Sequence, residues 1–233
     1  MGNDLHKEPS AKESPRFDWA VYADATFAGL AALIPLPIVD LYFEWLFRRR
    51  MVRAIALKNG RILNAPTINK INRNRSNRLS GCLLWPFKLL YSFIKKLSRK
   101  ILYFLAIKEA VDNLNYYWHR AFLLDHMMQA GYLDNSQAEI EQAALTLHIV
   151  LETTSESPLL QLARQVVGSG RHILLSLWRW RRHGEEDETA MAAKEQMKRR
   201  WHDFNAYFQQ LLILYDKTYV MLSSDSSSTN PDS

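Results

Sequence analysis

The sequence has no acidic residue between Glu44 and Glu109. The 64 intervening positions carry sixteen Lys and Arg, whereas the rest of the chain carries 14 basic and 24 acidic side chains. The net charge of +6 is therefore a property of residues 45–108, which we call the basic block. A separation of charge as sharp as this predicts an anionic partner and indicates no particular reaction.

Cysteine is almost absent as well. Cys82 is the only one, so no disulfide can form within the chain, and nothing around it marks a catalytic thiol. The polar N-terminus predicts no secretory signal, and residues 3–6 lack the Ser or Thr that N-myristoylation requires. These features fit a reducing compartment. We expect the protein at the cytoplasmic face of a membrane, peripheral or re-entrant, with the soluble cytoplasm as the alternative.

Glycine and proline are scarce, with 8 of each in 233 residues, and no segment alternates apolar and polar side chains between turn signals. These absences predict an all-α protein of six to seven helices. Residues 1–13 and 223–233 have the polar compositions of disordered tails. The predicted helical domain between them, 14–222, divides into an apolar hairpin at 14–60, a basic loop at 61–82 and a bundle at 83–222.

Two prolines interrupt the most apolar part of the chain. Pro35 and Pro37 remove backbone donors and push the preceding residues out of helical geometry. A first helix from Ser14 should therefore end before them, and a second should begin near Pro37 and stop at Gly60. Asp40, three residues into the second helix, can cap its exposed backbone donors and offset the helix dipole.

The two predicted helices differ in side-chain size. Ala25, Gly29 and Ala32 give the first helix a small-residue face, whereas the second is rich in Leu, Tyr, Phe and Trp. A small-residue face lets a neighbouring helix approach closely. We therefore expect a tight antiparallel hairpin in which this face lies against the bulky arm.

The apolar run Phe27–Phe47 has 21 residues, which is long enough in principle to span a membrane. The central prolines, Asp40 and Glu44 oppose a span, because a carboxylate within lipid costs about 2.5 to 3.5 kcal/mol and the prolines leave backbone groups unsatisfied. Three arrangements stay open: a shallow or re-entrant membrane hairpin, a hairpin buried within the protein, and a single span, which these residues disfavour.

Two segments of the hairpin resemble a bacterial family. Residues 33–40 (LIPLPIVD) and 51–60 (MVRAIALKNG) are similar to the hairpin of EcsC-type proteins, in which an apolar helix leads into an Ile-Pro-x-Pro-x-x-Asp turn and a helix that ends at glycine. The resemblance covers about 40 of the 233 residues. It implies a protein associated with membranes and transport systems, and it implies no enzymatic activity.

Residues 83–107 combine aromatic and basic side chains in a helical pattern. This pattern is typical of a helix in a membrane interface, where Lys and Arg reach the head groups and aromatic rings act as anchors. A core helix with a solvated basic face has the same periodicity, but a solvated face usually mixes both signs of charge. The aromatic anchor and the basic side chains of interest are Trp85, Lys88, Lys95, Lys96, Arg99 and Lys100.

Nucleic acid is a second anionic partner that the block could meet. Arg73, Arg75 and Arg78 alternate with Asn and Ser in the expected basic loop, where they could contact phosphates. No recognition helix, zinc-ligand spacing or RNA-binding sheet signature accompanies them, so the pattern favours a membrane.

Local signals divide the C-terminal part of the chain. A long helical segment should end near Gly131, and Ser136 with Glu139 forms a Ser-x-x-Glu capping box. Ser157-Pro158 opens another helix. The last helix should span about residues 185–222, with acidic residues in its first turn and apolar residues at three-four spacing.

No set of residues with recognisable catalytic or metal-binding spacing occurs. The chain lacks Glu-x-x-His and His-Glu-x-x-His spacings. Asp112, Asn115, His119 and His126 can share a helical ridge, which we interpret as a hydrogen-bonded or solvated face instead of a ligand set. We therefore predict no catalytic residue, no cofactor and no metal, and we do not expect an enzyme.

The sequence thus predicts an accessory or adaptor protein that uses the apolar hairpin and the basic block to engage anionic membrane lipids, and that also contacts another protein. A soluble helical domain that binds protein or nucleic acid through the block is the alternative. The predicted contact residues are Arg48, Arg49, Arg50, Arg53, Arg73, Arg75, Arg78, Trp85, Lys88, Lys95, Lys96, Arg99 and Lys100.

Overall fold

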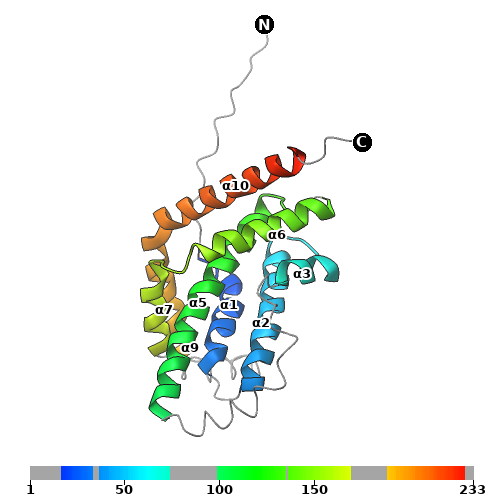
Figure 1. Ribbon diagram of the computed structural model, residues 1–233. Coiled ribbons are helices and arrows are strands. Elements are labelled where there is room, and N and C mark those ends of the chain that lie inside the picture. The colour runs from blue at the N-terminus through cyan, green and yellow to red at the C-terminus, as the bar shows by residue number, and fades with distance from the viewer. Residues whose placement is uncertain (1–16, 34–36, 74–98, 135, 169–187, 229–233) are drawn as a thin grey trace.

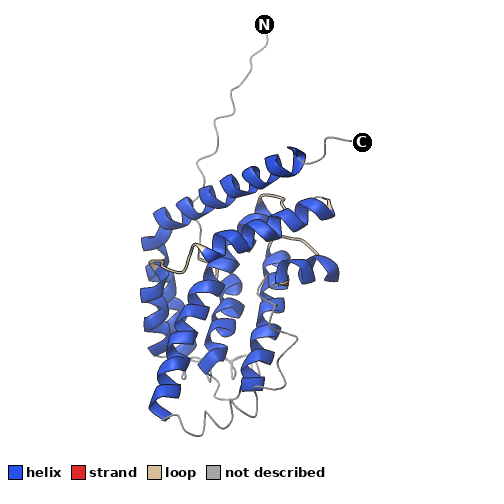
Figure 2. Ribbon diagram, in the orientation of Figure 1, coloured by secondary structure: helices blue, strands red, loops and turns tan. Residues whose placement is uncertain are grey.

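The chain folds into an all-α structure, as the sequence predicts (Figures 1 and 2). The structure is a computed structural model that describes residues 17–33, 37–73, 99–134, 136–168 and 188–228, and these residues contain no β-strand. The α-helices are α1 (Trp19–Leu30), α2 (Pro37–Lys58), α3 (Ala65–Asn72), α5 (Arg99–Gln129), α6 (Gln137–Glu152), α7 (Leu159–Gly168), α9 (Glu188–Trp201) and α10 (Asn205–Ser228). Two 3₁₀ turns, η1 (Ala31–Leu33) and η3 (His202–Phe204), extend α1 and separate α9 from α10.

The N-terminal helices α1 and α2 form the predicted antiparallel hairpin. The pairs that set its register, from the open end toward the turn, are Lys58–Asp18, Arg50–Asp24 and Phe47–Phe27. The first two are ion pairs of 3.6 and 3.3 Å, and the two phenyl rings stack with centroids 4.8 Å apart. Because α1 and α2 are separate helices that run in opposite directions, the run Phe27–Phe47 is not a single span.

Helix α1 lies between α2 and α5 in the interior of the protein (Figure 1). Every residue from Val21 to Ala31 is buried, which explains why this helix is apolar or small on all sides. The buried Thr26 hydroxyl is satisfied: it accepts the Trp118 indole N–H at 3.0 Å and donates to the Tyr22 carbonyl at 2.7 Å.

The small-residue face of α1 is used for packing, but Gly29 meets a different partner from the one we predicted. A Cβ atom added to Gly29 would lie 2.7 Å from the backbone nitrogen and Cα of Leu114 in α5. Ala25 is fully buried and Ala32 is half-buried. The expected close approach to the bulky arm is therefore wrong for Gly29, which instead allows α1 and α5 to touch backbone to backbone.

The expected loop 61–82 contains a helix that the sequence analysis missed. Helix α3 begins at Asn64, whose side chain accepts the Thr67 N–H at 2.9 Å. Pro66 occupies its first turn, where a missing N–H costs nothing. At the other end, the buried Arg120 guanidinium of α5 donates to the Ile71 carbonyl at 2.7 Å, so a cation meets the negative end of the helix dipole.

Most of the predicted helix boundaries are confirmed. Helix α2 begins at Pro37 and stops before Gly60, which has a φ of 68°, and Gly131 follows α5 with a φ of 82°. The capping box of Ser136 and Glu139 opens α6 as predicted. Ser14, the predicted start of the first helix, and the expected helix at residues 83–98 lie outside the described residues.

The predicted last helix is divided in two and is longer than expected. Trp201 ends α9, and the turn η3 separates it from α10, which reaches Ser228 and so includes residues that we assigned to a disordered tail. The break allows Trp201 to pack against both Tyr22 and Phe208, with ring centroids 4.3 and 4.9 Å apart. The C-terminal helices α9 and α10 are thereby joined to the core around α1.

Candidate functional site

The basic block does not stay unpaired once the chain is folded. Four of its described cations form ion pairs with carboxylates that come from outside the block, and the pairs are Arg50–Asp24, Lys58–Asp125, Arg61–Asp134 and Lys70–Glu141. A hydrogen bond from Lys70 and its charge lower the pKa of the Glu141 carboxyl. Charges that are segregated along the sequence are therefore partly neutralised in space.

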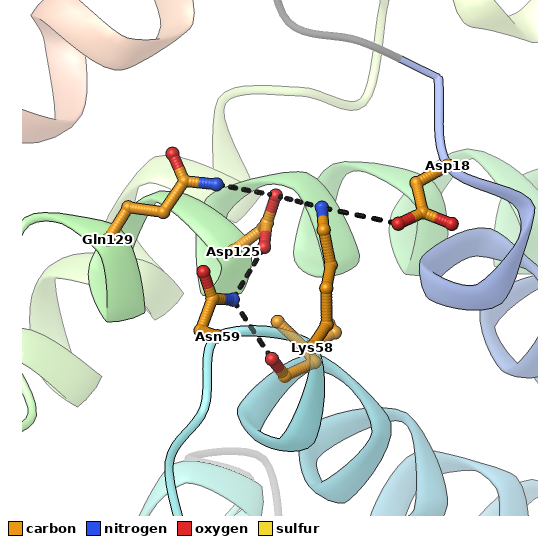
Figure 3. Close-up of polar contacts among 6 residues, drawn as sticks. Asp18, Lys58, Asn59, Asp125 and Gln129 are labelled. Atoms are coloured by element: carbon orange, nitrogen blue, oxygen red, sulfur yellow. Dashed lines mark hydrogen bonds and ion pairs between the residues drawn. The ribbon is translucent and has the colours of Figure 1, made fainter.

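A polar junction at the open end of the hairpin shows how this pairing works (Figure 3). The Lys58 ammonium lies 2.9 Å from Asp125 and 3.6 Å from Asp18, so one cation from α2 joins a carboxylate of α5 to the residue that precedes α1. The amide groups of Asn59 and Gln129 also donate to Asp125, at 2.8 and 3.0 Å. Since its two ion pairs join separate segments of the fold, Lys58 contributes to the fold and offers little to an external anion.

The exposed side of α2 is different. We define the outer face of α2 as Tyr42, Trp45, Arg49, Arg53 and Leu57. Tyr42, Trp45 and Leu57 are 57%, 45% and 69% exposed, and Arg53 is also exposed. None of the described carboxylates pairs with Arg49 or Arg53, so this face combines large apolar side chains with positive charge.

The geometry of this face follows from helical spacing. Tyr42, Arg49, Arg53 and Leu57 are separated by seven, four and four positions, so they form one stripe along α2. The opposite side of α2 packs in the core through Phe47, Met51, Val52, Ile55 and Ala56. The Arg49 guanidinium lies 5.0 Å from the centroid of the Trp45 ring, a cation–π distance, and also donates to Asn69 of α3 at 3.3 Å.

The remaining predicted contact residues have mixed outcomes. The Nε atom of Arg48 is enclosed by the protein and Arg50 is paired with Asp24, so both side chains are poorly placed to contact a partner. Arg73 is exposed at the end of α3. Arg99 and Lys100 start α5, but the structure does not describe their side chains.

Outside the described residues lie Arg75, Arg78, Trp85, Lys88, Lys95, Lys96 and Pro35. Pro37 and Asp40 lie in the first turn of α2, and the capping role of the Asp40 side chain stays a prediction.

The part of the expected basic loop that the structure describes is fastened to its neighbours. Lys70 of α3 pairs with Glu141 at 2.6 Å and donates to Gln137 at 2.5 Å, and both of these residues belong to α6. Asn72 accepts a hydrogen bond from Arg120 at 3.1 Å. The prediction of an open loop is therefore wrong for residues 65–72, and the phosphate-binding hypothesis now depends on Arg73 and the residues after it.

The polar ridge on α5 is divided among separate hydrogen-bond networks. Asn115 donates to the Thr154 carbonyl at 2.9 Å, and His119 donates from Nδ1 to the Asn115 carbonyl at 2.6 Å. The other ring nitrogen of His119 lies 2.7 Å from the Tyr207 hydroxyl, which must be the donor if Nδ1 carries the proton. Burial lowers the pKa of His119 to about 4, so the imidazole is neutral at pH 7, and burial raises the pKa of Tyr207 to about 12.

His126 lies farther along α5 and has other partners. Its Nε2 is 2.7 Å from the Asp216 carboxylate of α10, and the Tyr132 hydroxyl donates to the same oxygen at 3.0 Å. Burial, followed by this hydrogen bond, raises the pKa of Tyr132 to about 12. In the described part of the chain, no group of three His, Cys, Asp or Glu side chains is placed to hold a metal ion.

The fold and the site thus define a class: an all-α protein with a helical hairpin in which one arm is buried and the other presents a basic, aromatic face. No family model, curated protein or solved structure matches the chain at a significant level. The resemblance to EcsC-type proteins therefore stays a prediction. Among the helices that the structure describes, none combines the length and apolar character needed to cross a bilayer.

Proposed function

We propose that this protein is a membrane-associated accessory or adaptor protein that engages anionic lipid head groups through the outer face of α2 and other cations of the basic block. One observation carries the proposal: Tyr42, Trp45 and Leu57 are exposed beside Arg49 and Arg53, without a described carboxylate to neutralise them. The Tyr42 and Trp45 rings lie with centroids 6.2 Å apart, and an exposed apolar patch beside polar residues is typical of an interaction surface.

The chemistry of this face suits the boundary between lipid and water. Tyr and Trp rings prefer the head-group level, and Arg can extend its guanidinium toward phosphates while its stem covers apolar surface. Each basic residue close to an anionic leaflet contributes about 1 kcal/mol, so Arg49 and Arg53 together supply about 2 kcal/mol. Ile62, which is 94% exposed just after α2, adds apolar surface beyond the end of this face.

The proposed contact is peripheral. Helix α1 is enclosed by α2 and α5, and its insertion into lipid would remove the backbone contact between Gly29 and Leu114. We therefore assign the hairpin the role of a rigid support for the outer face of α2. This role replaces the re-entrant membrane hairpin, one of the arrangements that the sequence leaves open, in which α1 would insert into lipid. The resemblance to EcsC-type proteins supports a location at a membrane.

A single-stranded nucleic acid is the second candidate partner, because Tyr42 and Trp45 could stack on bases while Arg49 contacts phosphate. The aliphatic side chains Leu57 and Ile62 favour lipid over this candidate, since bases gain little from them. No reaction is assigned to either function.

Vesicle co-sedimentation tests the proposal. The wild-type protein should bind phosphatidylserine vesicles and ignore phosphatidylcholine vesicles. The double variant Arg49→Gln/Arg53→Gln should bind the anionic vesicles about thirtyfold more weakly, because about 2 kcal/mol is lost. Raising the salt concentration should weaken wild-type binding, since exposed charges are screened beyond a Debye length of about 10 Å at 0.1 M.

A matched control removes the same charge from another exposed surface. Arg199 and Arg200 are exposed on α9, so Arg199→Gln/Arg200→Gln lowers the net charge equally and leaves α2 unchanged. This variant should bind nearly as well as the wild type. Equal losses in the two double variants would show that only net charge matters, and binding to an oligonucleotide instead of vesicles would favour the second candidate.

A further inference from the structure

Helix α10 carries an exposed apolar ridge that the proposed membrane contact does not use. Ile213, Val220 and Met221 are 60%, 64% and 60% exposed, and Leu214 is exposed beside them. The exposed positions along the helix, which we call the outer face of α10, are Ala206, Gln210, Ile213, Leu214, Lys217, Val220, Met221 and Ser224. Ile213 with Val220 and Leu214 with Met221 are each seven positions apart, so the four large apolar side chains lie along one side of the helix.

The opposite side of α10 is firmly attached to the protein (Figure 1). Phe208, Leu211 and Tyr215 are buried, and the Tyr215 hydroxyl donates to the Ala143 carbonyl of α6 at 3.0 Å. Gln142 of α6 also donates to the Tyr219 carbonyl at 2.9 Å. The exposed ridge is therefore presented by a well-packed helix.

The ridge is symmetric about one charge. Ile213 and Leu214 lie four and three positions before Lys217, and Val220 and Met221 lie three and four positions after it. Lys217 is exposed and has no ion-pair partner among the described residues. A cation between two apolar steps favours a partner that places a carboxylate at this point.

The same symmetry disfavours a second copy of this chain. A two-fold arrangement that pairs both apolar steps, parallel or antiparallel, brings the two Lys217 side chains together. Like charges at the centre of a helix pair oppose association. The occupant should therefore be a different chain of complementary charge.

We propose that the outer face of α10 is a docking site for an amphipathic helix of another protein, in which an acidic residue lies between two apolar pairs. The apolar pairs would pack on Ile213, Leu214, Val220 and Met221, and the carboxylate would pair with Lys217. An adaptor of this design contacts a protein through α10 and uses α2 for another surface, although the α10 site does not depend on the membrane proposal.

A synthetic helical peptide provides the probe. It carries leucines at the spacing of positions 213, 214, 220 and 221, glutamate at the position of 217, and Ala and Gln elsewhere, and its fluorescence anisotropy reports binding to the full chain. The peptide should bind saturably, and a peptide with lysine in place of the glutamate should bind about tenfold more weakly, because attraction becomes repulsion. The protein variant Lys217→Glu should reverse this order of preference.

Two further variants separate apolar docking from loss of the fold. Ile213→Ser/Val220→Ser changes only exposed positions and should abolish peptide binding while the circular dichroism spectrum is retained. Leu105→Ser, at an exposed apolar position on α5, should leave peptide binding unchanged.

The proposal is overturned if neither peptide binds, if both bind alike, or if Lys217→Glu does not reverse the preference. Binding of phosphatidylcholine vesicles that is lost in Ile213→Ser/Val220→Ser would assign the ridge to lipid instead. A dimer in sedimentation that is lost in the same variant would assign it to a second copy of the chain.

Discussion

The two arms of the N-terminal hairpin are both apolar in sequence, yet the structure uses them in opposite ways. Helix α1 is buried from Val21 to Ala31 and touches α2 on one side and α5 on the other. Helix α2 buries one side and exposes Tyr42, Trp45, Arg53 and Leu57 on the other, with Arg49 half-buried among them. The more uniformly apolar arm is therefore internal, and the arm of mixed character faces the surroundings.

The difference teaches that apolar content does not identify the surface that meets a partner. A helix that is apolar on all sides is either inside a protein or inside lipid, and only packing decides between the two. For α1 the contact with Leu114 decides in favour of the protein interior. The following predictions test how far the two arms differ, from the largest expected effect to the smallest.

The strongest test of the buried arm is Gly29→Leu. The new side chain has to occupy the position of the Leu114 backbone, so we expect a loss of about 3 kcal/mol or more in the free energy of unfolding. Chemical denaturation measures the loss. Gly29→Ala should destabilise in the same direction, whereas Gly168→Ala should be neutral or stabilise by up to about 1 kcal/mol, because nothing lies within 4 Å of its added Cβ. Equal effects of the two alanine variants would contradict the close approach of α1 and α5.

The core around α5 should be sensitive to acid through His119. Its pKa is lowered from 6.5 to about 4 in the folded protein, so the unfolded chain binds the extra proton first as the pH falls. The contribution of His119 to stability is therefore complete above pH 6.5 and is lost between pH 6.5 and 4, by about 3 kcal/mol in all. Denaturation at several pH values should show a weaker pH dependence for His119→Gln than for the wild type. Parallel curves would show that His119 is not protected from protonation.

The junction at the open end of the hairpin should have a moderate effect. In Asp125→Asn the carboxylate that accepts from Lys58, Asn59 and Gln129 is replaced by a neutral amide. We expect a loss of about 1 to 2 kcal/mol in the free energy of unfolding, measured by denaturation. Asp203→Asn, at an exposed position in η3, is the control and should change the stability by less than about 0.5 kcal/mol.

The smallest expected change in stability concerns the outer face of α2. Arg49→Gln/Arg53→Gln should alter the free energy of unfolding by no more than about 1 kcal/mol, because the side chains make no ion pair among the described residues and Arg49 loses only its contacts with Trp45 and Asn69. Thermal unfolding of the purified protein measures this. A large loss of stability would mean that the outer face serves the fold, and any weaker vesicle binding could then not be assigned to a lost contact.

Features that depend on a few neighbouring residues could be predicted from the sequence. Each of these features affects the backbone close to it and marks a helix boundary in the structure: Pro37, Gly60, Gly131, and the capping box of Ser136 and Glu139. The hairpin follows from two such signals and a change in side-chain size. Helix α3 was missed although Asn64 and Pro66 mark its start, because the basic composition around it suggested a loop.

Features that depend on distant parts of the chain could not be predicted. The sequence shows that Gly29 lets a helix approach, but not that the helix is α5, since Leu114 is far away in the chain. The same holds for the basic block, whose cations form ion pairs with Asp24, Asp125 and Glu141 only after folding. The candidate site is accordingly narrower than the predicted list, because burial and pairing remove Arg48 and Arg50 from it.

The central claim is that the outer face of α2 meets an anionic membrane while α10 stays out of it, and an environment-sensitive fluorophore tests this directly. The label is attached at Leu57→Cys on the outer face of α2, or at Val220→Cys on α10, in a chain that also carries Cys82→Ser. With phosphatidylserine vesicles, the label at position 57 should become brighter and shift to the blue, and the label at position 220 should stay unchanged. An unchanged label at position 57, or equal shifts at both positions, would contradict the account.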